Sequence, residues 1–160
     1  MSRPITLLVL SICLNLTVTG LMAQQSKVSK KCFDKARTQS ELNECSGADA
    51  AAADRELNRI YQLILKKYAD QPIFIKRLHE AQRAWLKYRD AQLEMKYPTS
   101  TKGEKDEKHE TENGSVYPMC YASYKAELTS RRSKELREWL TGIEEGDVCA
   151  GSVKTPESLK

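Results

Sequence analysis

Apolar side chains recur every three or four residues over three stretches of the chain, a spacing that is typical of helices with one buried face. The first stretch covers about residues 39–69. It follows Thr38-Gln-Ser-Glu41, in which the Thr38 hydroxyl and the Glu41 carboxylate have the spacing of a helix-capping box. A helix is therefore expected from Gln39, with Gly47 as a weak point at which it can break into two.

The second stretch runs from Pro72 to Met95 or Lys96, and the third covers about residues 116–140. Pro72 suits the first turn of a helix, and Gly142 suits the C-terminal cap of the third. Between the second and third stretches, residues 99–114 contain no apolar side chain and predict a long charged loop. Because no segment of residues 24–160 alternates apolar and polar residues over a useful length, the pattern predicts an all-α fold.

The second predicted helix has apolar side chains on two faces about 100° apart. A helix of this kind packs against two neighbours, so we expect it to lie in the middle, with Trp85 and Tyr88 in the core. The two stripes are Leu78, Ala81, Ala84, Trp85, Tyr88 and Met95, and Ile75, Gln82, Leu86, Arg89 and Leu93.

The N-terminal segment has the order of residues of a secretory signal peptide. Arg3 precedes a largely apolar run at residues 5–18, which is too short to span a bilayer, and Ala23 is a suitable cleavage residue. We therefore expect residues 1–23 to be a signal peptide and the protein to be exported to the periplasm or outside the cell. No other apolar run is long enough for a membrane span.

Four cysteines follow the predicted signal peptide. An even number in an exported chain favours two disulfides, and the close cysteine pairs of a metal site are absent from the sequence. Three pairings are open; we expect Cys32–Cys45 and Cys120–Cys149, since each pair lies at one end of the helical pattern. The predicted fold is a disulfide-braced, antiparallel three-helix bundle over residues 24–147, followed by a tail at 148–160 that is held by Cys149.

Charge and candidate chemistry exclude several classes of function. The net charge of +4 is too small and too evenly mixed to indicate a nucleic-acid partner. His79 and His109 have no nucleophile or metal-binding motif around them, and no pair of carboxylates is singled out, so we expect neither an enzyme nor a metal or other cofactor. Arg89 and Asp90 are neighbours that point to different sides; Arg89 is expected to bridge helices through Asp54, Asn58 or Glu127.

Several pieces of the chain follow one another in the order found in one family. The pieces are Cys32, Thr38–Cys45, Ala53–Tyr61, Ala81–Trp85, Tyr88–Ala91, Asn113–Ser115, Glu127–Thr129 and Arg132. Together they resemble the N-terminal domain family of the lysozyme inhibitor LprI, small exported helical proteins of bacteria, over about residues 32–140. The signature positions within them are Asp54, Leu57, Asn58, Tyr61, Gln82, Trp85, Tyr88, Arg89 and Asp90.

The resemblance implies a non-catalytic binding protein that inhibits or modulates lysozyme-type muramidases. A second hypothesis is a structural or interaction module of the cell envelope that has no effect on lysozyme. Relatives carry a cysteine pair at the positions of Leu93 and Tyr124, which implies that these two side chains are in contact. The acidic side chains that are candidates for contact with a partner are Glu104, Asp106 and Glu107 in the charged loop, and Glu144, Glu145 and Asp147 near the tail.

Overall fold

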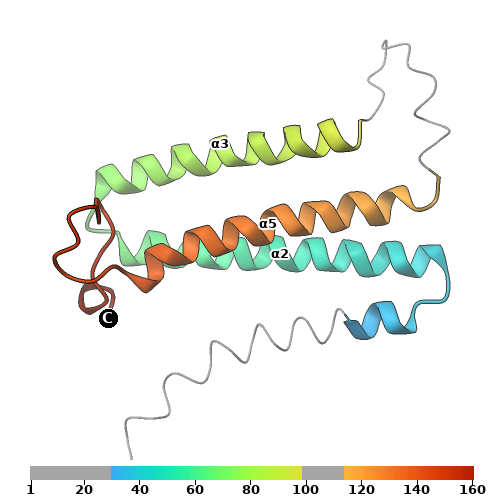
Figure 1. The fold of residues 1–160 in the computed structure, drawn as a ribbon, viewed down its shortest axis with the longest axis horizontal. Helices are drawn as coiled ribbons and strands as arrows, with labels where there is room; N and C mark the ends of the chain where they lie inside the picture. The colour runs from blue at the N-terminus through green and yellow to red at the C-terminus, as the bar shows by residue number, and fades with distance from the viewer. Residues whose placement is uncertain (1–29, 99–113) are drawn as a thin grey trace, which may run out of the picture.

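The computed structural model describes residues 30–98 and 114–160, and all its regular elements are helical. A short helical segment at residues 30–35 precedes α2 (Gln39–Lys67), α3 (Pro72–Lys96) and α5 (Tyr117–Thr141), and the chain closes with the 3₁₀ turn η1 (Glu157–Leu159). In Figure 1, α2 and α5 run in the same direction and α3 runs in the opposite one. The prediction of an all-α fold is confirmed.

Local signals set the helix boundaries. The Thr38 side chain accepts a hydrogen bond from the backbone N–H of Glu41, whose own side chain accepts from the backbone N–H of Thr38, so the capping box is present. Gly47 does not break α2, which continues through it. Pro72 lies in the first turn of α3, and Gly142, with φ 81°, caps α5. The expected helix ends therefore agree with the observed ones to within one or two residues.

The packing order of the helices differs from the prediction. α2 and α5 form the closely packed pair, and α3 approaches α5 less closely. The apolar stripes of α3 are correspondingly incomplete: Tyr88 is 57% exposed and Met95 70% exposed, so the expectation that Tyr88 belongs to the core is wrong. Small side chains explain the close pair, because Ser46 of α2 and Ser133 of α5 are buried and let the two helices approach.

The main core lies where the ends of α2 and α5 meet the start of α3 and the C-terminal segment. Trp85, Phe74 and Trp139 are partly buried against it, so the core prediction for Trp85 is confirmed in part. Away from this end, α3 buries Leu93. The buried members of the cluster are Leu57, Ile60, Ile64, Tyr68, Leu78, Leu136 and Leu159.

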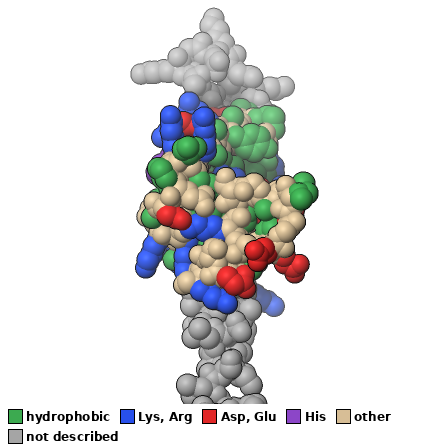
Figure 2. All heavy atoms as spheres, turned by 90° about the vertical axis from the view of Figure 1, so that its left-hand side faces the viewer, with side chains coloured by type: hydrophobic (Ala, Val, Ile, Leu, Met, Phe, Trp, Pro, Cys, Tyr) green, Lys and Arg blue, Asp and Glu red, His purple; other side chains and the backbone are tan. Residues whose placement is uncertain are grey.

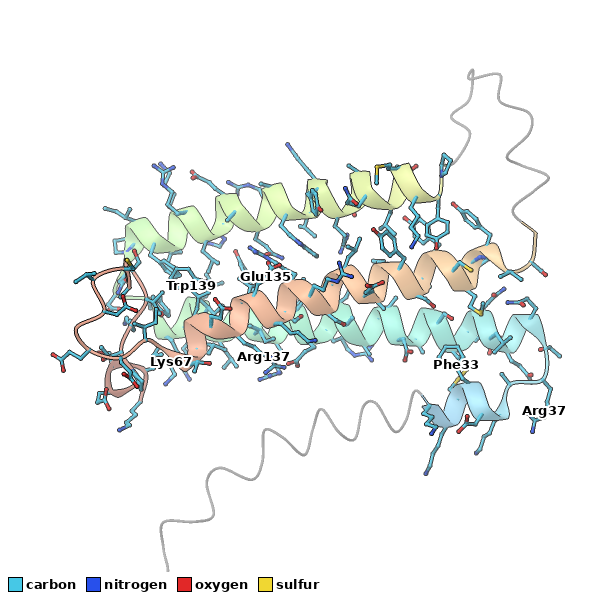
Figure 3. The ribbon with its side chains drawn as sticks, in the orientation of Figure 1. Phe33, Arg37, Lys67, Glu135, Arg137 and Trp139 are labelled. Carbon is cyan, nitrogen blue, oxygen red and sulfur yellow. A yellow bond between two sulfur atoms is a disulfide. The ribbon has the colours of Figure 1, made fainter. Side chains whose placement is uncertain are left out.

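The C-terminal segment is fastened to the core, although the sequence predicts a tail held by Cys149. Leu159 is buried, and the Lys67 ammonium donates to its carbonyl at 2.5 Å. The hydroxyl of Tyr68 donates to the carbonyl of Trp139 at 3.0 Å and accepts from the backbone N–H of Lys154 at 3.1 Å. Figure 3 shows Lys67 and Trp139 at this end of the molecule, where the segment folds back over the helices.

One of the two expected disulfides is present. Cys32 and Cys45 are bonded, with their Cα atoms 5.7 Å apart, which confirms this pairing. Cys120 and Cys149 are both free thiols, so their predicted pairing is wrong. Cys120 lies in the first turn of α5, whereas Cys149 follows its far end; at about 1.5 Å per residue this helix is roughly 35 Å long, several times the span of a disulfide.

Three of the sequence expectations fall outside the described residues. These are the signal peptide at residues 1–23, most of the loop at 99–114, and with it Glu104, Asp106 and Glu107. Within the described ranges, none of the helices is long and apolar enough to cross a membrane.

Candidate functional site

Two facing helix surfaces bring together more of the signature side chains than any other place in the described chain. Positions 54, 57, 58 and 61 of α2 are spaced so that they share one face, and positions 79, 82, 83, 86 and 89 of α3 do the same. Between them is an open groove of about 470 Å³, which we call the α2–α3 groove. Its lining residues are Asp54, Leu57, Asn58, Tyr61, His79, Gln82, Arg83, Leu86 and Arg89.

An ion-pair network closes one end of the α2–α3 groove. The Arg89 side chain is 12% exposed and its guanidinium lies 3.4 Å from Asp54, an interhelical partner that the sequence predicts. The same Asp54 carboxylate lies 2.8 Å from the ammonium of Lys125 on α5. Arg89 also pairs with Asp90 at 2.8 Å and lies over the ring of Trp85, 5.4 Å from its centroid. Asp54 therefore links all three helices.

A hydrogen bond closes the other end. The hydroxyl of Tyr61 lies 2.5 Å from Nδ1 of His79, and the two rings meet edge to face. Burial raises the pKa of Tyr61 above its usual value of 10.0, while the nearby positive charge of Arg83 acts in the opposite direction. The phenol therefore stays protonated at neutral pH and keeps this contact between α2 and α3.

Between the two closed ends, several polar groups face the groove without a partner from the protein. The side chains of Asn58 and Arg83 form no hydrogen bond or ion pair with any other described residue. The side-chain carbonyl of Gln82 accepts from Arg132 at 3.2 Å, which leaves its two amide hydrogens to donate elsewhere. Leu86 is 37% exposed and adds apolar surface, while Leu57 lies buried at the floor of the groove. The middle of the groove thus combines one unpaired cation, two side-chain amides and an apolar strip.

The groove is suited to binding a polar, negatively charged group. Arg89 is paired with Asp54 and Asp90, and Asp54 also pairs with Lys125, so the charge left for a ligand is that of Arg83. Within residues 30–98 and 114–160, no cluster of three or more His, Cys, Asp or Glu side chains is placed to hold a metal ion.

Three of the signature residues do not line the groove: Trp85 is partly buried against the main core, and the other two are Tyr88 and Asp90. Tyr88 and Asp90 are exposed on other faces of α3. Conversely, His79, Arg83 and Leu86 line the groove although they were not predicted to belong to a site. Arg83 follows His79 by four residues and precedes Leu86 by three, and this spacing is the signal that could have placed the three on one face.

The second candidate surface is the acidic turn that follows α5. Glu144, Glu145 and Asp147 are all exposed there, and the Asp147 carboxylate accepts from the backbone N–H of Cys149 at 2.7 Å. Figure 2 faces this end of the molecule and shows acidic side chains gathered along its lower right edge. The segment that carries them is held by Lys154, which donates to Asp70 at 2.6 Å and lowers the pKa of that carboxyl group.

Comparison with known proteins agrees with the resemblance seen in the sequence. Residues 32–136 match the family described as "Lysozyme inhibitor LprI", and this range spans α2, α3 and most of α5. A protein of Rhizobium meliloti (strain 1021), described as "Uncharacterized protein R02472", is 35% identical over 121 residues, which cover 69% of this chain and 79% of that protein. No solved structure matches the chain. The family match and this relative together show that the chain belongs to the LprI lysozyme inhibitor family.

Proposed function

We propose that the chain is an exported, non-catalytic binding protein that inhibits or modulates a lysozyme-type muramidase. The observation that carries the proposal is the family match over residues 32–136, which includes the described helices almost completely. In this proposal residues 1–23 direct export and are removed. The helices then act as an antiparallel bundle, braced by Cys32–Cys45, that forms a rigid support for the contact surface.

The acidic turn is the described surface best suited to meet such an enzyme. Lysozymes that are strongly basic favour acidic partners, because complementary charge speeds encounter and orients the two proteins. Glu144 and Glu145 are exposed side by side, and the hydrogen bonds of Lys154 and Tyr68 anchor the segment behind them. An anchored loop loses less conformational entropy on binding than a free one. The acidic loop residues Glu104, Asp106 and Glu107 are a further proposed contact.

Lysis of bacterial cell walls tests the proposal directly. Residues 24–160, oxidised so that Cys32–Cys45 is formed, are added in excess to lysozymes of several structural types, and the fall in turbidity is followed. Slower lysis by at least one lysozyme supports the proposal. Unchanged rates with all of them would refute it and favour an envelope interaction module, whereas clearing by the protein alone would identify a muramidase.

A pair of matched variants tests the contact surface. Replacing Glu144 and Glu145 together by Gln removes two charges from the acidic turn, and replacing Asp34 by Asn and Glu44 by Gln removes two exposed charges from the opposite end. We expect the first variant to lose about 3- to 30-fold in affinity for the lysozyme, and the second to lose less than about 2-fold. Equal behaviour of the two variants would rule out the acidic turn as the contact.

A further inference from the structure

We propose that the α2–α3 groove is a binding site for a sugar that carries a carboxylate. The geometry points to this ligand through the middle of the groove, where the side chains of Arg83 and Asn58 have no hydrogen-bonding or ion-pair partner among the described residues. A guanidinium is suited to a carboxylate because its N–H groups match the two oxygens in a planar, two-point contact. The choice of an acidic sugar of the cell wall as ligand rests on the proposed function.

The rest of the groove suits the sugar ring. The amides of Asn58 and Gln82 supply donors for ring hydroxyl or acetamido oxygens, and Asn58 also supplies an acceptor. Leu86, which is 37% exposed, offers apolar surface against which the C–H face of a pyranose can pack. The volume of about 470 Å³ is suitable for one sugar unit and is far larger than a simple carboxylic acid requires.

The structure also explains why the groove stays open. α2 and α3 are joined at its two ends by side chains that reach across, Asp54 to Arg89 and Tyr61 to His79, whereas their backbones do not pack closely between these points. A ligand that fills the gap therefore displaces water rather than protein contacts. Since the site is formed by two helices held at both ends, little rearrangement is needed on binding.

Binding can be measured by NMR with three probes that differ in one group each. N-acetylmuramic acid carries both sugar and carboxylate, N-acetylglucosamine lacks the lactyl carboxylate, and D-lactate lacks the sugar. We expect N-acetylmuramic acid to shift the side-chain amide signals of Asn58 and Gln82 with a Kd on the order of millimolar, and the other two probes to bind at least about 5-fold more weakly. Equal binding of N-acetylglucosamine would overturn the role of the carboxylate, equal binding of D-lactate would overturn the role of the sugar, and no shift with any probe would overturn the site.

Variants separate the groove from the rest of the protein. Arg83→Gln removes the unpaired guanidinium, and Arg55→Gln is its matched control, since Arg55 is an exposed arginine of α2 outside the groove. We expect about a 10-fold loss of N-acetylmuramic acid binding in the first and less than 2-fold in the second. Asn58→Asp, which introduces a negative charge without removing volume, should abolish binding. Unchanged binding in Arg83→Gln or Asn58→Asp would overturn the assignment.

The outcomes for the two proposals are distinguishable. The lysis assay measures the effect on lysozyme, whereas the amide shifts of Asn58 and Gln82 measure ligand binding in the α2–α3 groove. If the native protein binds N-acetylmuramic acid but does not slow lysis, the proposed function fails and the groove assignment stands. If it slows lysis but shows no shift, the groove assignment fails and the proposed function stands.

Discussion

Replacement of Tyr68 by Phe should destabilise the protein strongly, although it removes one oxygen atom from a chain of 160 residues. Tyr68 is fully buried, and its hydroxyl donates to the carbonyl of Trp139 and accepts from the N–H of Lys154. Phe keeps the ring contacts with Phe74 and Trp139. The change therefore isolates the hydroxyl, which joins α2 to the end of α5 and to the C-terminal segment.

The size of the effect follows from the two hydrogen bonds. Each contributes about 1 kcal/mol net, and the carbonyl and N–H left without a partner add a desolvation cost, so we expect a loss of about 2 to 3 kcal/mol in the free energy of unfolding. For a domain of this size that corresponds to roughly 8–12 °C in Tm. The C-terminal segment should also loosen, which would appear as faster amide exchange at Lys154 and Leu159.

Urea unfolding followed by circular dichroism, without reducing agent, measures the change. Tyr88→Phe is the matched control, since Tyr88 is 57% exposed and its hydroxyl forms no hydrogen bond with a described residue. It should alter stability by less than about 0.5 kcal/mol. If Tyr68→Phe also stays within this limit, the C-terminal segment is not held by the Tyr68 hydroxyl and the reasoning fails.

Three further predictions concern the disulfide, two glycines and one carboxylate. Reduction of Cys32–Cys45, which are 13 residues apart, should cost about 3 kcal/mol of stability, and a peptide map of the unreduced protein should show this disulfide alone. Gly142→Ala should destabilise by more than about 1 kcal/mol, because its Cβ would lie 2.8 Å from a backbone carbonyl and φ is 81°; Gly47→Ala, in open space within α2, should instead stabilise by about 0.5–1 kcal/mol in the same urea assay. The pKa of Glu56 is held below 4.5, first by a hydrogen bond from Arg59 and then by the charges of Arg59 and Arg137. The ionised Glu56 therefore contributes its full share of the folding stability above pH 4.5, and this share is lost as the pH falls through the lowered pKa. Glu56→Gln should reduce the loss of stability measured between pH 5 and pH 2.

The helix boundaries could be predicted because they depend on neighbouring residues. The Thr38 and Glu41 side chains cap α2 through contacts three residues apart, Pro72 needs no partner to start α3, and Gly142 ends α5 through its own backbone conformation. None of these signals requires knowledge of how the helices pack. The same holds for Cys32–Cys45, whose short separation lets the two residues meet at one turn.

The packing could not be predicted from the apolar pattern, because small polar residues decide it. Ser46, Thr129 and Ser133 are buried between α2 and α5, where their size allows close approach, and the hydroxyls of Ser46 and Ser133 donate to backbone carbonyls four residues earlier. Because the apolar pattern counts these residues as polar, it predicts that they face solvent and that α3 is the central helix of the bundle. The docking of the C-terminal segment could not be predicted for a related reason, since Lys67 and Tyr68 of α2 and its C-cap hold it through its backbone groups, which leave no pattern in the sequence.

The position of α3 has a consequence for where function lies. A helix packed on both sides would leave no groove, whereas α3 is buried only near Leu78 and Leu93. Between these points Arg89 and His79 reach across to α2. Asp54 connects this arrangement to the close pair through Lys125 of α5. The exposed stripe of α3 and the open α2–α3 groove are thus two results of the same packing. Asp54, Asn58, Tyr61, Gln82 and Arg89, which carry part of the family resemblance, line the groove that this packing leaves accessible.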